Sequence, residues 1–279
     1  MNKMTMLLGL LVAIMSVSAS GVGFIGTPTA ELDQGQWNVG FNYIYSDMEL
    51  DKTKVTGSWQ DFALDGTPTN NGTLSSETEI DDVKTQRYYG TIGYGITNSW
   101  EAYIQLGVAD VKAETKTPLG DFDELNGGTN FDNDFAYGWG TRYTFHEQNN
   151  VRWGVSLQMN WLDTSVDSKS TWALESEEQQ IDWETYDLLI AVGPTVDMGG
   201  WNLYGGPFYY MLDGDLDMEG SETWPAGYGT WEGSGDLEAD GIGVFVGAQC
   251  TLMEKYDMTT ELSFTGDGWA IGAGVAVPF

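Results

Sequence analysis

The stretch Val151-Arg-Trp-Gly-Val-Ser-Leu-Gln-Met-Asn-Trp161 alternates with a period of two residues. Each odd position carries a large apolar residue, and each even position carries a polar residue or glycine. Successive side chains of a β-strand point to opposite faces of its sheet. The pattern therefore predicts a strand with one apolar and one polar face, about as long as a tilted strand that crosses a bilayer.

The same alternation recurs along the chain, and the connections between the alternating segments have two lengths. Those at 97–99, 147–150, 198–200 and 254–257 are short, and a further short one lies near 266–268. Those at 49–84, 112–132, 163–184 and 213–240 are long. Tight turns at one end and long loops at the other are typical of bacterial outer-membrane barrels, whereas a soluble β-sandwich gives no reason for this alternation. We predict an all-β fold, a transmembrane antiparallel up-and-down β-barrel of about ten strands. The other nine segments cover residues 37–45, 88–96, 100–108, 135–145, 186–192, 201–212, 242–252, 258–264 and 271–279.

Tryptophans mark one end of the predicted barrel. Trp37, Trp100, Trp153 and Trp201 each stand at or near the first residue of a segment, beside the short turns. Tryptophan is enriched where a membrane meets water, because one part of the ring prefers lipid and the other water. We expect these four residues to form an interface belt.

The charge of the chain is concentrated in the long connections. The 279 residues include 42 acidic and 11 basic ones, which argues against a nucleic-acid partner. A hydrophobic share of 41% argues against disorder, and a single cysteine excludes a disulfide framework. With their flanking acids, the four long connections hold 32 acidic and six basic residues. We therefore predict four long acidic surface loops.

The first residues have the features of a signal peptide. Lys3 precedes an apolar run over 6–15, and Val17-Ser-Ala19 supplies the small residues that a signal peptidase recognises. We expect cleavage after Ala19, which leaves the barrel domain at residues 20–279.

The C-terminal run Trp269-Ala-Ile-Gly-Ala-Gly-Val-Ala-Val-Pro-Phe279 resembles the last strand of outer-membrane proteins, although Pro278 departs from the common pattern. The resemblance implies an integral protein of a Gram-negative-type outer membrane with both termini in the periplasm. It also implies that Phe279 is part of the signal recognised by the barrel assembly machinery. The stretch Gly23-Phe-Ile-Gly-Thr-Pro-Thr-Ala30 is similar to the start of mature chains in several barrel families.

Six charged residues fall on the lumen face of the predicted strands, where they avoid the cost of facing lipid, about 2–4 kcal/mol for an arginine. They either form an ion-pair network that stiffens a narrow barrel or a constriction that selects ions. Several inward glycines leave space, whereas aromatic side chains or residues 22–30, folded in as a plug, could fill it. The six are Arg87, Glu101, Arg142, Arg152, Asp187 and Glu261.

Catalysis and specific metal binding find little support in the sequence. Ten-stranded omptin proteases need a histidine–aspartate pair at the outer rim, but the single histidine, His146, falls beside a short turn. We therefore expect no enzyme and no cofactor. Asp213, Asp215, Asp217 and Glu219 resemble the start of a calcium loop, but Met218 and Trp224 stand where glycine and glutamate are required. Only loosely bound Ca²⁺ or Mg²⁺ is expected there.

Two functions remain for such a barrel. The first is a porin-like small channel for small, preferably cationic solutes, because acidic loops around the entrance attract cations. The alternative is a closed structural or surface-interaction barrel whose loops contact divalent cations, lipopolysaccharide or a host. In either case the expected partners are outer-membrane lipid, lipopolysaccharide and the assembly machinery, and the chain is expected to be a monomer.

Overall fold

The computed structural model describes residues 23–49, 53–78, 80–115, 129–172 and 175–279. The predicted signal peptide, residues 1–19, lies outside the described residues. The described strands are β1 (Trp37–Met48), β2 (Thr53–Ala63), β3 (Pro68–Thr78), β4 (Ile80–Thr97), β5 (Trp100–Thr115), β6 (Thr129–Gln148), β7 (Val151–Trp172), β8 (Glu175–Asp197), β9 (Trp201–Trp224), β10 (Gly227–Leu252), β11 (Tyr256–Phe264) and β12 (Gly268–Pro278).

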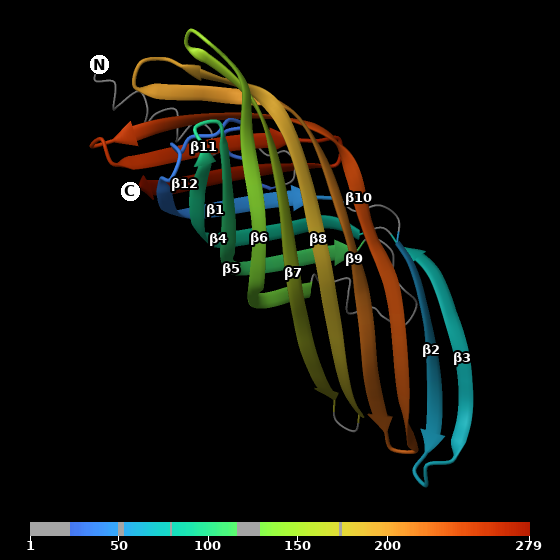
Figure 1. The fold of residues 1–279 in the computed structure, drawn as a ribbon. Helices are drawn as coiled ribbons and strands as arrows, with labels where there is room; N and C mark the ends of the chain where they lie inside the picture. Colours follow the sequence, from blue (N-terminus) through green and yellow to red (C-terminus); the bar gives the residue numbers. More distant parts are fainter. Residues whose placement is uncertain (1–22, 50–52, 79, 116–128, 173–174) are drawn as a thin grey trace, which may run out of the picture.

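Ten of these strands close into an antiparallel barrel (Figure 1). The order runs from β11 through β12, β1 and β4 to β10, and β10 pairs again with β11 to complete the ring. Each predicted segment overlaps one barrel strand, so the predicted fold is confirmed. None of the described residues forms a helix long and apolar enough to cross a membrane.

The expectation of long loops needs correction, because most of their described residues continue the sheet. Strands β7 to β10 run far beyond the barrel, and the connection over 49–84 contains the hairpin β2–β3. Strand β10 pairs with β11 through 244–252 and with β2 through 227–235, so it belongs to the barrel and to its extension. Polar side chains do not prevent these strands, because a sheet is held together by backbone hydrogen bonds.

We call this extension the wing: β2, β3 and the parts of β7 to β10 over 163–172, 175–185, 213–224 and 227–240. It projects to the lower right in Figure 1. The other end of the barrel has the expected tight connections at 98–99, 149–150, 198–200 and 253–255, and we call it the short-turn end. The acidic residues assigned to loops are therefore largely carried by the wing.

The outer face of the barrel is apolar, and many polar side chains are buried on its inner face. Phe41 and Ile104 are about half exposed on the outer face, whereas Asn160 and Gln105 on the inner face are almost completely buried. Trp37, Trp100, Trp153 and Trp201 are all exposed near the short-turn end. Such an inverted distribution suits a surface that contacts lipid. The belt function of the four tryptophans stays a prediction.

Candidate functional site in the barrel lumen

The segment before β1 lies inside the barrel. This N-terminal segment, residues 23–36, starts in the middle of the lumen, where Gly23 lies beside Leu189 of β8. It runs to the short-turn end, where Asp33 lies against Gly95 of β4. Ile25 is only 2% exposed. The described part of the predicted plug, residues 23–30, is therefore folded into the lumen.

Glu261 of β11 holds the inner part of this segment. Its two carboxylate oxygens accept hydrogen bonds from the backbone N–H groups of Ile25 at 2.8 Å and Gly26 at 2.9 Å. A buried segment without regular structure has backbone donors that need partners. Glu261 satisfies two of them with one side chain.

Glu101 of β5 holds the outer part in the same way. One of its oxygens accepts hydrogen bonds from the backbone N–H groups of Glu31 at 2.8 Å and Leu32 at 3.0 Å. The other accepts a hydrogen bond from Nη1 of Arg142 at 2.8 Å. The Arg142 guanidinium also lies over the ring of Tyr103, 4.9 Å from its centre. Glu101 therefore joins the segment to the charged side chains of the wall.

Side chains on another part of the barrel wall also hold the N-terminal segment. Arg152 donates a hydrogen bond to the carbonyl of Ala30 at 2.7 Å, and the Ala30 N–H donates to Oγ1 of Thr144 at 3.0 Å. The hydroxyl groups of Thr29 and Thr195 are 2.8 Å apart. Because these residues come from β6, β7 and β8, the segment is held from several sides of the barrel.

A polar network continues deeper into the lumen. Tyr103 donates a hydrogen bond to Gln158 at 2.8 Å, and the amide of Gln158 contacts Asn160 at 3.3 Å. Asn160 donates to Asp187 at 2.6 Å, and Asp187 pairs with Arg87 at 2.6 Å. Among the described residues, the ion pairs Arg142–Glu101 and Arg87–Asp187 are thus linked through neutral side chains.

Apolar side chains also point into the lumen, beside this network and beyond it toward the wing. We call this group the apolar tier. Its members come from seven barrel strands, are each at most 6% exposed and belong to one buried cluster. Such packing leaves few gaps for water. The tier consists of Ile44, Met48, Val83, Val111, Leu162, Leu189, Phe208, Tyr210, Leu212 and Leu237.

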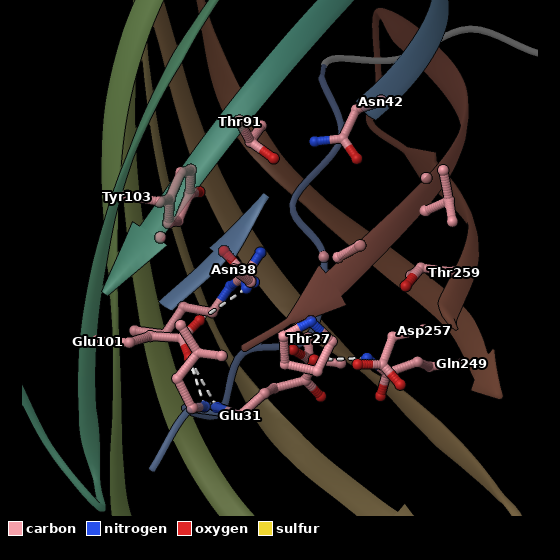
Figure 2. Close-up of a pocket in the computed structure, with 18 of the residues that line it drawn as sticks. Thr27, Glu31, Asn38, Asn42, Thr91, Glu101, Tyr103, Gln249, Asp257 and Thr259 are labelled. Atoms are coloured by element: carbon pink, nitrogen blue, oxygen red, sulfur yellow. Dashed lines mark hydrogen bonds and ion pairs between the residues drawn. The ribbon is translucent and has the colours of Figure 1, made fainter. Parts of the chain in front are cut away.

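A polar cavity of about 130 Å³ lies between the N-terminal segment and the wall near the short-turn end. Asn38, Asn42 and Thr91 line it from β1 and β4, and Glu31 lines it from the N-terminal segment (Figure 2). Gln249 of β10 donates a hydrogen bond to the Glu31 carboxylate. Burial raises the pKa of the Glu31 carboxyl group, and the neighbouring carboxylate of Glu101 raises it further.

Comparison with known proteins agrees with this architecture. Residues 97–279 match the outer membrane protein beta-barrel domain family. The chain belongs to this family. The match covers more than half of the chain and identifies it as an integral protein of a bacterial outer membrane. No curated protein matches the chain in sequence.

Several solved outer-membrane barrels are similar to this family member in fold. The outer membrane protein OprG from Pseudomonas aeruginosa has a TM-score of 0.37 and 12% identity, covering 88% of this chain and 97% of OprG. The protease OmpT from Escherichia coli has a TM-score of 0.39 and 8% identity, covering 86% of this chain and 97% of OmpT. The translocator domain of the autotransporter NalP from Neisseria meningitidis has a TM-score of 0.41 and 11% identity, covering 89% of each chain.

The structure brings the six predicted lumen residues into this outer membrane barrel but gives them different partners. Glu101, Arg142, Arg152 and Glu261 contact the N-terminal segment or one another, whereas Arg87 and Asp187 pair deeper in the lumen. Sequence reasoning missed Thr144, Gln158, Asn160, Thr195 and Gln249. The even or odd places of Thr144, Gln158, Asn160 and Gln249 in the alternating segments give their direction. Thr195 lies outside the predicted segment 186–192, and no pattern gives the partners of any of the five.

The residues predicted outside the lumen do not gather into a site. Asp213, Asp215, Asp217 and Glu219 are alternate residues of β9 and form a row along its outer face. Alternate side chains on a strand are about 7 Å apart, too far to surround one ion. Within the part of the chain that the structure describes, no group of three or more potential ligands could hold a metal.

Two further predicted positions lie at the short-turn end of this barrel. His146 is near the end of β6, beside the turn at 149–150, and is exposed. Phe279 pairs with Trp37 through two backbone hydrogen bonds, and its side chain is 70% exposed. The last residue therefore helps to close β12 against β1 and leaves its ring accessible.

Proposed function

We propose that this outer-membrane protein is a closed barrel that anchors an interaction surface, the wing, at the cell exterior. The observation that carries the proposal is the filled lumen. The N-terminal segment occupies its short-turn half, and the apolar tier packs into its middle and the part toward the wing. A solute would have to displace both to cross. Of the two functions that the sequence leaves open, the filled lumen favours the closed surface-interaction barrel.

The proposed orientation places the short-turn end in the periplasm. Outer-membrane barrels have short periplasmic turns and longer extracellular connections. The wing would then face outward, and Phe279 would lie where the assembly machinery acts. Its exposed ring supports a role in the assembly signal.

The closed lumen predicts an electrically silent protein. After refolding into a planar bilayer, the chain over residues 20–279 is expected to give no channel steps. Deletion of residues 23–34 is expected to leave it silent as well, because the apolar tier remains. Replacing Arg87, Arg142 and Arg152 with alanine provides a further comparison. Stable conductance steps in the wild-type protein would contradict the proposal.

A gated channel is the second candidate, and the polar cavity favours it. The N-terminal segment is held by hydrogen bonds and packing, and the 130 Å³ cavity already separates part of it from the wall. Release of the segment would widen this space, and the acidic wing would favour cations. Steps that appear only after deletion of residues 23–34 would support this candidate over the closed barrel.

The outer face of the wing favours divalent cations as partners. Four acidic residues stand directly opposite one another on four neighbouring strands. Asp163 lies opposite Glu184, Glu184 opposite Asp215, and Asp215 opposite Asp236. Like charges that are directly opposite in a sheet destabilise it. Divalent cations would offset this repulsion and could bridge the carboxylates to phosphate groups of lipopolysaccharide.

We therefore expect divalent cations to stabilise the wing. Millimolar Mg²⁺ should slow protease cleavage within the wing compared with NaCl of equal ionic strength, and a chelator should reverse the effect. Glu184→Gln with Asp215→Asn removes two of the repelling charges and should reduce the difference between the salts. Equal protection by Mg²⁺ and by matched NaCl would contradict a role for divalent cations.

A further inference from the structure

The outermost strand of the wing has a free edge. Strand β3 pairs with β2 on one side, and none of the described strands pairs with its other side. The backbone N–H and C=O groups along a free edge can pair with another chain. The edge runs along residues 68–78 and, in the proposed orientation, faces the cell exterior.

The second free edge of the wing is partly blocked, which sets β3 apart. Pairing of β7 with β6 ends at Leu162, so the rest of β7 has no strand on that side within the described ranges. There the Asp134 carboxylate accepts hydrogen bonds from the backbone N–H of Ser165 and from the hydroxyl of Thr164. No comparable contact to the backbone of β3 is seen from the described side chains.

The sequence of β3 also lacks the usual protection of an edge strand. Exposed edges commonly carry charged residues, lysine above all, or proline within the strand. Residues 66–76 include no charged residue, although the chain has 42 acidic and 11 basic ones, and the one charged residue of β3 is Glu77, next to the end of the strand. The only proline, Pro68, is the first residue of the strand. The edge is therefore open to pairing along most of its length.

The surface next to this edge is aromatic and acidic. Trp59 of β2 lies over Gly72 of β3, because a Cβ atom at Gly72 would be 2.7 Å from Nε1 of the indole. On the other side of β2, Trp59 lies directly opposite Trp231 of β10. Asp61 lies two residues from Trp59 on the same strand, opposite Asn70. Tryptophan rings attract cations, and a neighbouring carboxylate strengthens that preference.

We propose that the edge of β3 binds an extended, basic polypeptide segment, which adds to the wing as a further strand. Backbone hydrogen bonds to β3 would supply affinity, as in other cases of strand addition. A lysine or arginine opposite Gly72 on the added strand would point to the same face as Trp59, whose indole already extends over Gly72 toward that strand, with the Asp61 carboxylate nearby on β2. The inference rests on the proposed surface function of the wing.

The charge of the wing selects against a second copy of the chain as the occupant. Two wings that met at β3 would bring two strongly acidic sheets together, and like charges disfavour such pairing. A basic segment instead reduces the charge repulsion. Self-association through β3 is consequently an outcome that would overturn the proposal.

The test uses the full mature chain in neutral detergent and two short, labelled, end-blocked peptides. One alternates lysine with threonine, and the other has glutamate in place of each lysine. Fluorescence anisotropy is expected to detect binding of the lysine peptide only. Thr73→Lys with Ser75→Lys, two exposed positions of β3, should weaken binding at least about tenfold. The matched control, Thr230→Lys with Ser234→Lys on exposed positions of β10, changes the net charge equally and should weaken it less than about threefold.

A deletion keeps the test decisive if the lysine variants fold poorly. Replacing residues 53–78 with a short glycine–serine linker removes β2 and β3 but leaves all ten barrel strands. Its barrel can be checked by heat-modifiable gel mobility, and it should not bind the lysine peptide. Binding that survives the deletion, equal loss in both lysine pairs, or dimers that the deletion converts to monomers would each overturn the proposal. Bilayer conductance is a separate readout, so channel steps would contradict the closed barrel without deciding peptide binding.

Discussion

Arg142→Ala is expected to lower the free energy of unfolding by about 3–5 kcal/mol, because it leaves a buried carboxylate without its ion-pair partner. Glu101 is only 3% exposed, and Arg142 donates to it at 2.8 Å while stacking on Tyr103. The two backbone N–H groups of Glu31 and Leu32 would still donate to Glu101, so the loss should fall at the lower end of this range.

Arg152→Ala is the matched control for this prediction. Arg152 also faces the lumen, but its hydrogen bond there goes to a neutral acceptor, the carbonyl of Ala30. Its removal should cost about 1–2 kcal/mol. Urea unfolding in detergent micelles, followed by tryptophan fluorescence and gel mobility, measures both variants. Equal losses would mean that the pair of Arg142 with Glu101 is not the main anchor.

Gly26→Ala is expected to release the N-terminal segment from the lumen. Gly26 has φ of +73°, and a Cβ atom there would be 2.6 Å from Nη2 of Arg142. The guanidinium of Arg142 would have to shift, which strains its ion pair with Glu101. A residue other than glycine at such φ costs about 1–2 kcal/mol in addition. Limited proteolysis with mass spectrometry should detect cleavage within residues 23–36 at least about ten times faster than in the wild type.

Gly35→Ala separates the two causes. Gly35 has a similar φ of +82°, but nothing lies within 4 Å of a Cβ atom built there. It should therefore show the backbone strain without displacing Arg142. If Gly35→Ala accelerated cleavage as much as Gly26→Ala, backbone strain alone would explain the result and the contact with Arg142 would be unimportant.

The alternation of the sequence was sufficient to predict the barrel because its period fixes which way each side chain points. It placed Arg87, Glu101 and Glu261 in the lumen and Trp100 on the outer face. It could not assign partners, since Arg87 pairs with Asp187, 100 residues away, through the curvature of the closed sheet. Direction is a local property of a strand, but contact across a lumen is not.

The wing and the N-terminal segment show two further limits of sequence reasoning. Residues 68–76 contain few apolar side chains, so they resembled a loop although they form β3 with backbone hydrogen bonds to β2. The N-terminal segment has no periodic pattern that would predict its path. Its apolar residues indicated burial, but its position depends on Glu101 and Glu261, which are distant in sequence.

The central claim is that the N-terminal segment fills the short-turn half of the barrel lumen, and a disulfide tests this position directly. Thr29 and Thr195 have hydroxyl oxygens 2.8 Å apart, close enough for two cysteines at these positions to bond after small adjustments. The pair is introduced with Cys250→Ser, and a control carries Thr29→Cys with Thr91→Cys on a different part of the wall. Mass spectrometry of peptides from the oxidised, refolded protein should identify a link between residues 29 and 195 and none between 29 and 91. Absence of the 29–195 link in a folded barrel would place the segment outside the lumen and contradict the account.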